Sequence, residues 1–190
     1  MVARFTVVAL DLDADRSSFA SGVEPLDRYF KTQVSQDIKR RVTACFTALD
    51  TSGCVAGYYT LASASILLSD LPENLAKKLP RYPNVPAVRM GRLAVDQAFK
   101  GQGLGAALLA DALRRAVTAE IAAYAFVVEA KDEGAARFYA HHGFLSAQDN
   151  PLFLYLPLAT VKDLLAVSVV KTSPAKTLAT KTPSSRRTRS

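Results

Sequence analysis

GRLAVDQAFKGQGLG, residues 91–105, contains the strongest signal for the fold and the function that we expect for this chain. Residues 91–96 alternate as a strand does, residues 97–103 have no regular pattern, and a long amphipathic helix begins at Leu104. The glycines of the loop carry no Cβ atom, so their backbone N–H groups can approach a ligand closely. Free N–H groups in the first turn of the helix add to them. The stretch therefore predicts a site for an anion such as phosphate, with a plain glycine-rich turn as the alternative.

Two familiar nucleotide-binding loops do not fit the residues at the start of this helix. A P-loop requires Gly-Lys-Ser/Thr there, whereas this chain has Gly103, Leu104 and Gly105 and so lacks a hydroxyl for Mg²⁺. The dinucleotide pattern GxGxxG fails as well, because the glycines fall at positions 101, 103 and 105. We therefore expect neither a nucleoside triphosphatase nor a dinucleotide-binding protein.

The chain has the length and composition of one soluble domain with a full core: 190 residues, 49% apolar and 22% charged. No apolar run is long enough to span a membrane, and the charged residues among the first 20 do not fit a secretory signal. We therefore expect a cytoplasmic protein with no membrane partner. Cys45 and Cys54 lie in apolar segments without cysteine or histidine at ligand spacing, so we predict two reduced core residues and no metal ion.

The positive charge is concentrated at the end of the chain, whose net charge is +7. Of the 24 basic residues, six lie in residues 166–190, which contain no acidic residue, so 18 basic residues remain against 17 acidic ones. We predict a folded domain over residues 1–165 and a basic, disordered tail over residues 166–190. The tail is either an electrostatic arm for nucleic acid or a solubilising end.

Hydrophobic patterns and turn residues predict the other elements. Before the glycine loop they are a strand at 5–10, a helix at about 24–38, strands at 42–49 and 54–67 that form an antiparallel hairpin, a helix at 72–79 and a loop at 81–86. After the start of the long helix they are a strand at 124–130, a helix at about 132–142, a strand at 152–156 and a short helix from Thr160.

In the long helix the apolar residues share one face, with Asp111, Arg114 and Arg115 opposite. The strand at 124–130 runs parallel to the strand at 91–96 if the connection between them is an ordinary crossover. The order of helices and strands predicts a mixed α/β fold with one central sheet.

Residues 100–105, KGQGLG, resemble the pyrophosphate-binding segment of the GCN5-related N-acetyltransferases (GNAT), whose pattern is Arg/Gln-x-x-Gly-x-Gly/Ala. Lysine stands where arginine or glutamine is usual and keeps a positive charge beside the phosphates. Residues 127–144, VVEAKDEGAARFYAHHGF, resemble the segment in which these enzymes end a strand, open a helix with asparagine and place a tyrosine before Gly-Phe. Here Asp132 stands at the asparagine position and Tyr139 at the tyrosine position.

This resemblance implies the GNAT fold, in which a mixed sheet flanked by helices contains two parallel strands that splay apart. It also implies acetyl-CoA as co-substrate, with the pantetheine added to an open strand edge and the pyrophosphate on the glycine loop. The residues that the resemblance assigns to acetyl-CoA are Leu93, Ala94, Val95, Lys100, Gly101, Gln102, Gly103, Leu104, Gly105 and Asp132.

The chemistry that the resemblance implies is acylation of an amine. A neutral amine attacks the thioester, and coenzyme A leaves as a thiolate that a nearby proton donor would stabilise. Tyr139 is the candidate donor, because a phenol with the ordinary pKa near 10 stays protonated at neutral pH. The alternative is a core tyrosine on an apolar helix face. Of His141 and His142, one should point to solvent and the other to the sheet. Neither is assigned a role.

Three further segments, VAGYYTLASAS at 55–65, VPAVRMGRLAVD at 85–96 and NPLFLYLPLATVKDLL at 150–165, resemble the GNAT toxins of bacterial type II toxin–antitoxin modules, of the TacT and AtaT type. This resemblance covers roughly residues 4–165. It implies acetylation of the α-amino group of aminoacyl-tRNA, a block of translation, a homodimer, a ribbon-helix-helix antitoxin, and operator DNA bound through the antitoxin complex.

Binding of tRNA requires cations near the acceptor site. The candidates are Lys39, Arg40, Arg41, Lys77, Lys78, Arg81, Arg89 and Arg92. Arg89 and Arg92 are three residues apart in a predicted strand, so we expect them to face opposite ways. Each cation could instead be an ordinary surface charge, and those at positions 39–41 also complement a helix dipole.

Two other functions remain open. The chain could be a GNAT enzyme that acetylates a small amine or a protein N-terminus, which an acidic substrate groove would favour. It could also be a nucleic-acid-binding protein without enzymatic activity, whose toxicity would not depend on the Tyr139 hydroxyl.

Overall fold

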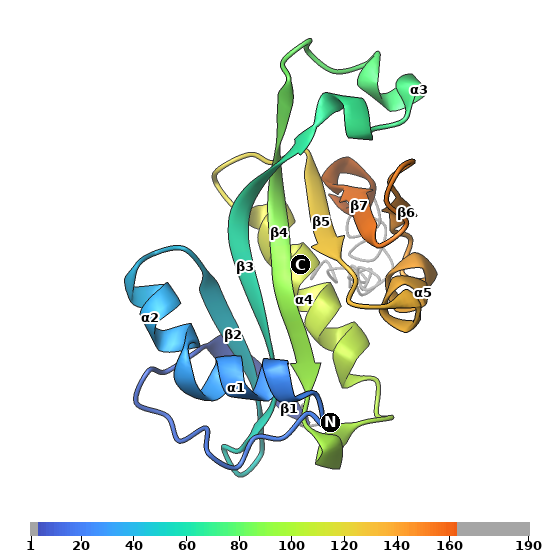
Figure 1. Cartoon of the computed structure of the whole chain (residues 1–190). Coiled ribbons are helices and arrows are strands. Elements are labelled where there is room, and N and C mark those ends of the chain that lie inside the picture. Colours follow the sequence, from blue (N-terminus) through green and yellow to red (C-terminus); the bar gives the residue numbers. More distant parts are fainter. Residues whose placement is uncertain (1–3, 163–190) are drawn as a thin grey trace, which may run out of the picture.

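One seven-stranded sheet with helices on both faces forms the protein in a computed structural model that describes residues 4–162 (Figure 1). The strands lie in the order β1-β2-β3-β4-β5-β7-β6, and β4 and β5 are the one parallel pair among the strands described. The predicted mixed α/β fold with one sheet is confirmed.

The bounds of the elements are as follows. The strands are β1 Phe5–Ala9, β2 Ala44–Asp50, β3 Val55–Leu67, β4 Asn84–Val95, β5 Ala125–Glu129, β6 Leu145–Ser146 and β7 Phe153–Pro157. The helices are α1 Glu24–Thr32, α2 Val34–Lys39, α3 Glu73–Ala76, α4 Leu104–Thr118 and α5 Glu133–His141, with short 3₁₀ segments η1 Leu68–Asp70 and η2 Gln97–Phe99.

The two parallel strands, β4 and β5, separate partway along their length. β5 pairs with β4 over Ala87–Met90 only, whereas β3 on the other side pairs with β4 as far as Val95. The last pair of β4 with β5 is Met90 with Val128. We call the place where the strands part, beyond this pair, the fork. Past the fork the edge of β4 that faces β5 has no strand partner within residues 4–162, as expected for splayed parallel strands.

The helices divide the sheet into two faces with separate cores (Figure 1). α4 and α5 cover one face, the α4 face, where Leu108 and Tyr139 belong to the same buried cluster as Met90. α1 and α2 cover the other, the α1 face, where the ring of Phe30 stacks on that of Tyr58. β2, β3 and β4 contribute to both cores because successive residues point to opposite faces, and beside β5 and β7 the α1 face has a second core that contains Val127 and Tyr155.

An extra residue in β4 changes the direction that we expected for its arginines. Successive residues of β3 pair with Arg92 and with Met90, so Gly91 between them forms a bulge. The bulge shifts the alternation of side chains by one residue, with Met90 in the core of the α4 face. Arg89 and Arg92 therefore both lie on the α1 face, and the prediction that they face opposite ways was wrong.

Three further details of the predicted elements need correction. The helix predicted at 24–38 is two helices, because the chain bends at Gln33, which ends α1 with a φ of −115°. The loop predicted at 81–86 ends early, since β4 already begins at Asn84. β6 was not predicted, because a strand of two residues is too short to show alternation.

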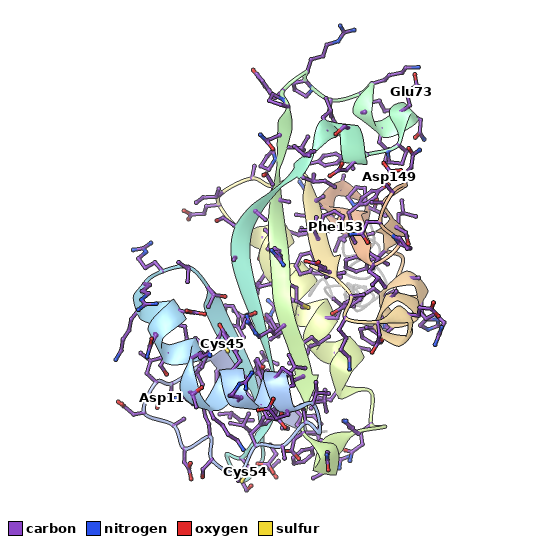
Figure 2. All side chains as sticks on the ribbon, viewed as in Figure 1. Asp11, Cys45, Cys54, Glu73, Asp149 and Phe153 are labelled. Carbon is purple, nitrogen blue, oxygen red and sulfur yellow. The ribbon has the colours of Figure 1, made fainter. Side chains whose placement is uncertain are left out.

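The two cysteines have different surroundings, as Figure 2 shows. Cys45 is buried, and burial raises the pKa of its thiol to about 12. Cys54 is exposed, and its backbone N–H donates to the carboxylate of Asp50 in the hairpin turn before β3. The prediction of two core cysteines was therefore right for Cys45 and wrong for Cys54. Both thiols are free.

Some expectations concern the end of the chain. The basic tail predicted at 166–190 and the domain boundary at 165 lie outside the described residues. Residues 158–162 are helical, so the last predicted helix starts two residues earlier than Thr160. None of the described helices is both long enough and apolar enough to cross a membrane.

Candidate active site

The glycine loop between β4 and α4 leaves open space beside its backbone. Gly101 and Gly103 have positive φ angles of 74° and 77°, a conformation that favours glycine. A Cβ atom at either position would meet nothing within 4 Å. α4 then begins at Leu104 and contributes the unpaired N–H groups of its first turn. This geometry fits a diphosphate, which needs several converging N–H donors and close approach to the backbone.

The polar side chains of the loop are not buried. Lys100 is exposed directly before Gly101, so its ammonium group is free to move toward an anion at the loop. The side-chain amide of Gln102 donates to the carbonyl oxygen of Ala98 at 3.3 Å, which ties the loop to η2. The Asp96 carboxylate accepts the backbone N–H of the same alanine at 2.9 Å and so fixes the start of η2.

The start of α4 is packed closely against its neighbours. The side chain of Leu104 is buried, so its backbone N–H is the part that can reach a ligand. A Cβ atom at Gly105 would lie 3.8 Å from Val95 and 3.9 Å from Phe138, which is ordinary contact. The glycine therefore lies where α4, β4 and α5 come together, and the loop is held on a rigid base.

Leu93, Ala94 and Val95 form the part of β4 that lies beyond the fork. β3 pairs with them as far as Val95, and none of the described strands pairs with their other edge. Leu93 and Val95 pack on the α4 face, and Ala94 is buried on the α1 face. The free edge leads from the fork toward the glycine loop, so an extended molecule with amide groups could pair with it as a strand does.

Tyr139 of α5 reaches the fork from the α4 face. Its side chain is 9% exposed, and its hydroxyl lies 3.9 Å from the Sδ atom of Met90, the last β4 residue paired with β5. A thioether is a weak acceptor, so the hydroxyl proton remains available to a stronger one. Burial raises the pKa of Tyr139 to about 12, which corrects the expected value near 10. The phenol is therefore protonated at neutral pH.

Asp132, predicted to contact pantetheine, caps α5. Its carboxylate accepts the backbone N–H of Ala135 at 2.7 Å, and this hydrogen bond lowers the pKa of the carboxyl. The Nζ atom of Lys131 lies 3.5 Å from the other carboxylate oxygen. The cap accounts for an acidic residue here without any ligand, and the contact with pantetheine stays a prediction.

The two histidines at the end of α5 differ in exposure. His141 is exposed. His142 is half-buried, its Nδ1 atom lies 2.8 Å from the carbonyl oxygen of Phe138, and its ring lies against the Phe138 ring. These contacts are those of a residue that closes a helix.

The α1 face of the fork carries charged side chains. Arg89 forms an ion pair with Glu129, the last residue of β5, at 3.0 Å. The guanidinium carbon of Arg92 lies 3.3 Å from the centre of the Tyr29 ring, in a cation–π contact. The Tyr29 hydroxyl donates to Asp37 at 2.9 Å, which fixes the ring. Glu129 and Tyr29 were not predicted; a charged residue at the end of a central strand is the signal that could have identified Glu129.

A hollow of about 530 Å³ lies beside these arginines, between the end of α2 and strands β2 and β3. Arg41 and Val42 line it on one side, and Ala62 lines it on the other. Because Ala62 pairs with Arg89 across β3 and β4, the hollow adjoins the charged part of the fork. Arg41 has a φ of 59°, a left-handed conformation that is uncommon outside glycine.

The predicted tRNA-binding cations form two groups. The first group lies on β4 or at the end of α2, which covers the α1 face, and consists of Lys39, Arg40, Arg41, Arg89 and Arg92. The second group lies on and after α3 and consists of Lys77, Lys78 and Arg81. Lys77 is ion-paired with Glu73 at 2.6 Å. In Figure 1, α3 lies at the far end of the sheet from α1, so the structure does not bring the two groups together.

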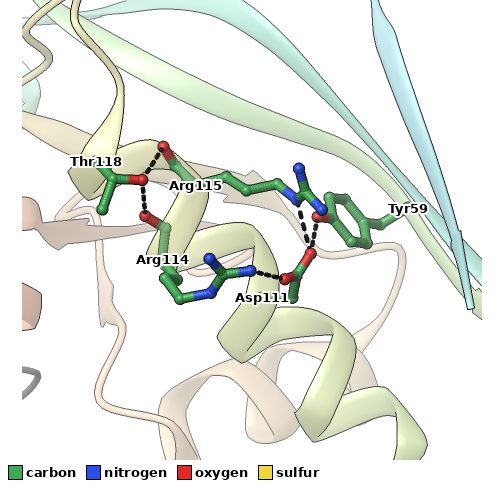
Figure 3. Close-up of polar contacts among 5 residues, drawn as sticks. All are labelled: Tyr59, Asp111, Arg114, Arg115 and Thr118. Atoms are coloured by element: carbon green, nitrogen blue, oxygen red, sulfur yellow. Dashed lines mark hydrogen bonds and ion pairs between the residues drawn. The ribbon is translucent and has the colours of Figure 1, made fainter. Parts of the chain in front are cut away.

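A polar cluster joins α4 to the sheet on the α4 face (Figure 3). Asp111 accepts the Tyr59 hydroxyl at 2.5 Å and the Nε–H of Arg115 at 2.7 Å, and Arg114 donates to its other oxygen. Burial by itself would raise the pKa of Asp111, but hydrogen bonds from Tyr59 and the two arginines lower it overall. Asp111 was predicted on the side of α4 away from the sheet, and this was wrong because it binds a sheet residue.

Comparison with known proteins gives a consistent result. Residues 11–144 match the acetyltransferase (GNAT) family. The chain is 35% identical over 153 residues to a "tRNA-acetylating toxin" of Mycobacterium tuberculosis, a match that covers 80% of this chain and 90% of the relative.

Solved structures of similar proteins include complexes. AtaT complexed with acetyl-methionyl-tRNAfMet is 31% identical to this chain, with a TM-score of 0.79. A tyrosine-to-phenylalanine mutant of KacT is 27% identical, with a TM-score of 0.80. Each match covers 85% of this chain and 99% of the solved chain. Two further complexes are also similar: a mutant AtaT bound to the C-terminus of the antitoxin AtaR and to acetyl-CoA, and a KacTA–DNA complex. Each has a TM-score of 0.72 and 27% identity, and each match covers 86% of this chain and 99% of the solved chain.

Proposed function

The chain belongs to the acetyltransferase (GNAT) family and has its fold, and we propose that it is a toxin that transfers acetyl from acetyl-CoA to the α-amino group of aminoacyl-tRNA and so blocks translation. The fork carries this proposal. Tyr139 reaches it from one face, arginines lie on the other, and the open glycine loop follows along β4. The similarity to proteins named for tRNA acetylation supports the substrate.

Acetyl-CoA, in this proposal, lies along β4 from the fork to the glycine loop. Its pantetheine amides pair with the free edge at Leu93–Val95, and its diphosphate accepts N–H groups of Gly101–Gly105. Lys100 adds a positive charge beside the phosphates, and Asp132 faces the pantetheine. The positive φ angles and free space at the loop glycines support this placement, and so does the acetyl-CoA complex of AtaT.

Tyr139 protonates the leaving group. As the C–S bond breaks, negative charge develops on sulfur, and the hydroxyl at the fork supplies the proton. Because burial raises the pKa of Tyr139 to about 12, the donor is fully protonated at neutral pH. The surrounding aromatic rings, Phe138 and Phe144, limit access of water, which strengthens the interaction of the hydroxyl with a developing charge.

The acceptor end of the tRNA approaches on the α1 face. Arg89 and Arg92 lie at the fork, and Arg41 lines the adjoining hollow, so three cations attract phosphates to one surface. The hollow has room for part of a nucleotide or an amino-acid side chain. Lys39 and Arg40 extend this surface, and we propose that Lys77, Lys78 and Arg81 contact a more distant part of the tRNA.

The further partners are also proposals. AtaT is known with the antitoxin AtaR, and KacTA with DNA. For this chain we propose a ribbon-helix-helix antitoxin, operator DNA bound through the toxin–antitoxin complex, and a homodimeric toxin. Aminoacyl-tRNA is found in the cytoplasm, and we propose that the protein acts there.

Mass spectrometry of total aminoacyl-tRNA tests the activity. The purified protein is incubated with acetyl-CoA and aminoacyl-tRNA, and the aminoacyl ends are released and weighed. We expect a gain of one acetyl group on the amino acid of at least one tRNA, and none when acetyl-CoA is left out. Unmodified tRNA, together with acetylation of a small amine or of a peptide N-terminus, would contradict the proposed substrate.

A further inference from the structure

The Arg89–Glu129 pair stands at the fork on the face opposite Tyr139, and from this geometry we infer that the carboxylate of Glu129 binds the reacting amino group and accepts its proton. Arg89 is a positioning residue that holds this carboxylate. The inference rests on the proposed function and deepens it, because it identifies the group that receives the proton of the aminoacyl-tRNA amine.

Glu129 occupies a defined position at the fork. It is the last residue of β5 and follows Val128, the residue paired with Met90. Since Val128 points to the α4 face, the side chain of Glu129 points to the α1 face. There its Oε2 atom lies 3.0 Å from a guanidinium nitrogen of Arg89, and 59% of the side chain is exposed. The carboxylate is therefore both held in place and accessible to a substrate.

Tyr139 and Glu129 approach the fork from opposite sides of the sheet. The Tyr139 hydroxyl lies against Met90 on the α4 face, and Glu129 lies one residue beyond the partner of Met90 on the α1 face. A group bound between the separated strands would have a proton donor on one side and a carboxylate on the other. An acyl transfer needs this separation, because one proton is delivered to the leaving atom while another is removed from the attacking atom.

Other carboxylates on the helices of the α1 face have partners within the fold. Asp37 accepts the Tyr29 hydroxyl at 2.9 Å, and Asp27 accepts the hydroxyl of Ser21 at 2.5 Å. Glu129 instead has an arginine partner at the edge of the fork. An arginine beside a carboxylate suits a substrate that carries phosphates and an amino group on the same end, as aminoacyl-tRNA does.

The proton balance of the transfer is then complete. An α-amino group has an ordinary pKa of about 7.7–8.0, so at neutral pH it arrives mainly as ammonium and first releases one proton to solvent, which leaves a neutral amine with a lone pair beside Glu129. Nitrogen bonds to the acetyl carbon, the C–S bond breaks, sulfur takes the proton of Tyr139, and the carboxylate of Glu129 takes the proton lost by nitrogen. Solvent then removes the proton from Glu129 and returns one to Tyr139.

Kinetics of acetyl transfer to total aminoacyl-tRNA test the inference. We expect Glu129→Gln, which keeps the size of the side chain, to lower kcat/KM about 100-fold, as loss of a proton acceptor does. Glu129→Asp keeps a carboxylate that is one methylene shorter and should lose only about tenfold. Glu24→Gln removes an exposed, ion-paired glutamate of α1 and is the matched control, with activity unchanged. Acetyl-CoA affinity, measured by calorimetry, should be the same in all variants.

A double-mutant cycle tests the role of Arg89. If Arg89 acts through Glu129, then Arg89→Gln combined with Glu129→Gln should be no slower than Glu129→Gln by itself. A wild type that acetylates tRNA and a Glu129→Gln variant within about twofold of it would overturn the inference but not the proposed function. A fully additive cycle would overturn the positioning role of Arg89. A wild type that leaves aminoacyl-tRNA unmodified would overturn both proposals.

Discussion

The two faces of the sheet at the fork differ in chemical character. On the α4 face Tyr139 lies in an apolar core, against Met90 and beside the rings of Phe138 and Phe144. On the α1 face the side chains at the same level are Arg89 and Glu129, both more than half exposed. One face is dry and fixed, and the other is charged and open to solvent.

This difference corresponds to the two substrates that we propose. The acetyl donor is the same in every turnover, so the groups that receive it can be buried and rigid. The acceptor is a large polyanion that must arrive and leave, which favours exposed cations. A dry site also strengthens a hydrogen bond to a developing charge, whereas an exposed ion pair contributes little to stability and leaves its charged groups accessible to a substrate. The contrast predicts that substitutions on the two faces will affect different steps.

Removal of the Tyr139 hydroxyl should have the largest effect. We expect Tyr139→Phe to lower kcat for acetyl transfer about 100-fold or more, because the leaving sulfur loses its proton donor. The affinity for acetyl-CoA should hardly change, since the ring and its packing remain. A growth assay beside calorimetry measures both, and growth arrest should be abolished.

A second tyrosine provides the control for this variant. Tyr155 is buried and its hydroxyl has no hydrogen-bond partner within the described residues, so Tyr155→Phe removes the same atom from a tyrosine of β7 that belongs to a different cluster from Tyr139. It should leave both kcat and growth arrest unchanged. Equal activity of Tyr139→Phe and the wild type would show that the Tyr139 hydroxyl is not the proton donor, and so that the α4 face does not supply this step.

A methyl group at the glycine loop should have an intermediate effect. Gly103→Ala places a Cβ atom in open space, so the protein itself accommodates it apart from a backbone cost of about 1 kcal/mol at positive φ. We expect the Kd for acetyl-CoA to rise about tenfold, because the methyl group occupies the space beside the N–H groups.

Gly53→Ala is a matched control for the backbone cost. Gly53 also has a positive φ, of 85°, and a Cβ atom there would also meet nothing within 4 Å, but it lies in the β2–β3 turn. The two variants should lose similar stability in urea, and the Kd for acetyl-CoA should rise in Gly103→Ala alone. Equal affinities would show that the loop is a plain turn.

Loss of the Asp111 carboxylate should have the smallest effect on activity. Asp111→Asn breaks the cluster that joins α4 to Tyr59 (Figure 3), and we expect the free energy of unfolding to fall by about 1–2 kcal/mol with kcat within about twofold. Because the folded protein lowers the pKa of Asp111, this stabilisation is present above the unfolded pKa of about 3.9 and is lost as pH falls through the folded value.

Urea unfolding at two pH values checks this prediction. The difference between the wild type and Asp111→Asn should be full at pH 7 and smaller at pH below about 4. Glu24→Gln, which breaks an exposed pair with Arg28, should change stability little at either pH. A constant difference at all pH values would mean that the charge of Asp111 does not stabilise the fold.

The two faces also differ in how much of them could be predicted. The glycine loop and Tyr139 belong to continuous segments in which spacing determines position, and a family resemblance covers both. In the structure the loop follows the end of β4, and the Tyr139 hydroxyl of α5 lies 3.9 Å from Met90 of the same strand. The succession of the main strands along the chain was predictable for the same reason, since each has a local hydrophobic pattern. Their full order in the sheet, with β7 between β5 and β6, was not predicted.

The arrangement of the α1 face depends on contacts between distant residues. The bulge at Gly91 arises from the pairing of β4 with β3, and it puts Arg92 on the same face as Arg89 rather than on the opposite one. The alternation of apolar and polar residues in the sequence does not reveal it. Glu129 becomes a candidate only once β5 is seen to end beside Arg89. Asp111 was assigned to the solvent side because helical periodicity does not indicate that a tyrosine of β3 lies opposite.

A crystal structure of the protein with acetyl-CoA tests the division of the fork between the two faces most directly. We predict the diphosphate on the N–H groups of Gly101–Gly105, the sulfur within hydrogen-bonding distance of the Tyr139 hydroxyl, and the acetyl carbon open to the α1 face beside Glu129. A diphosphate bound elsewhere, or an acetyl group that can be reached only from the α4 face, would contradict this account.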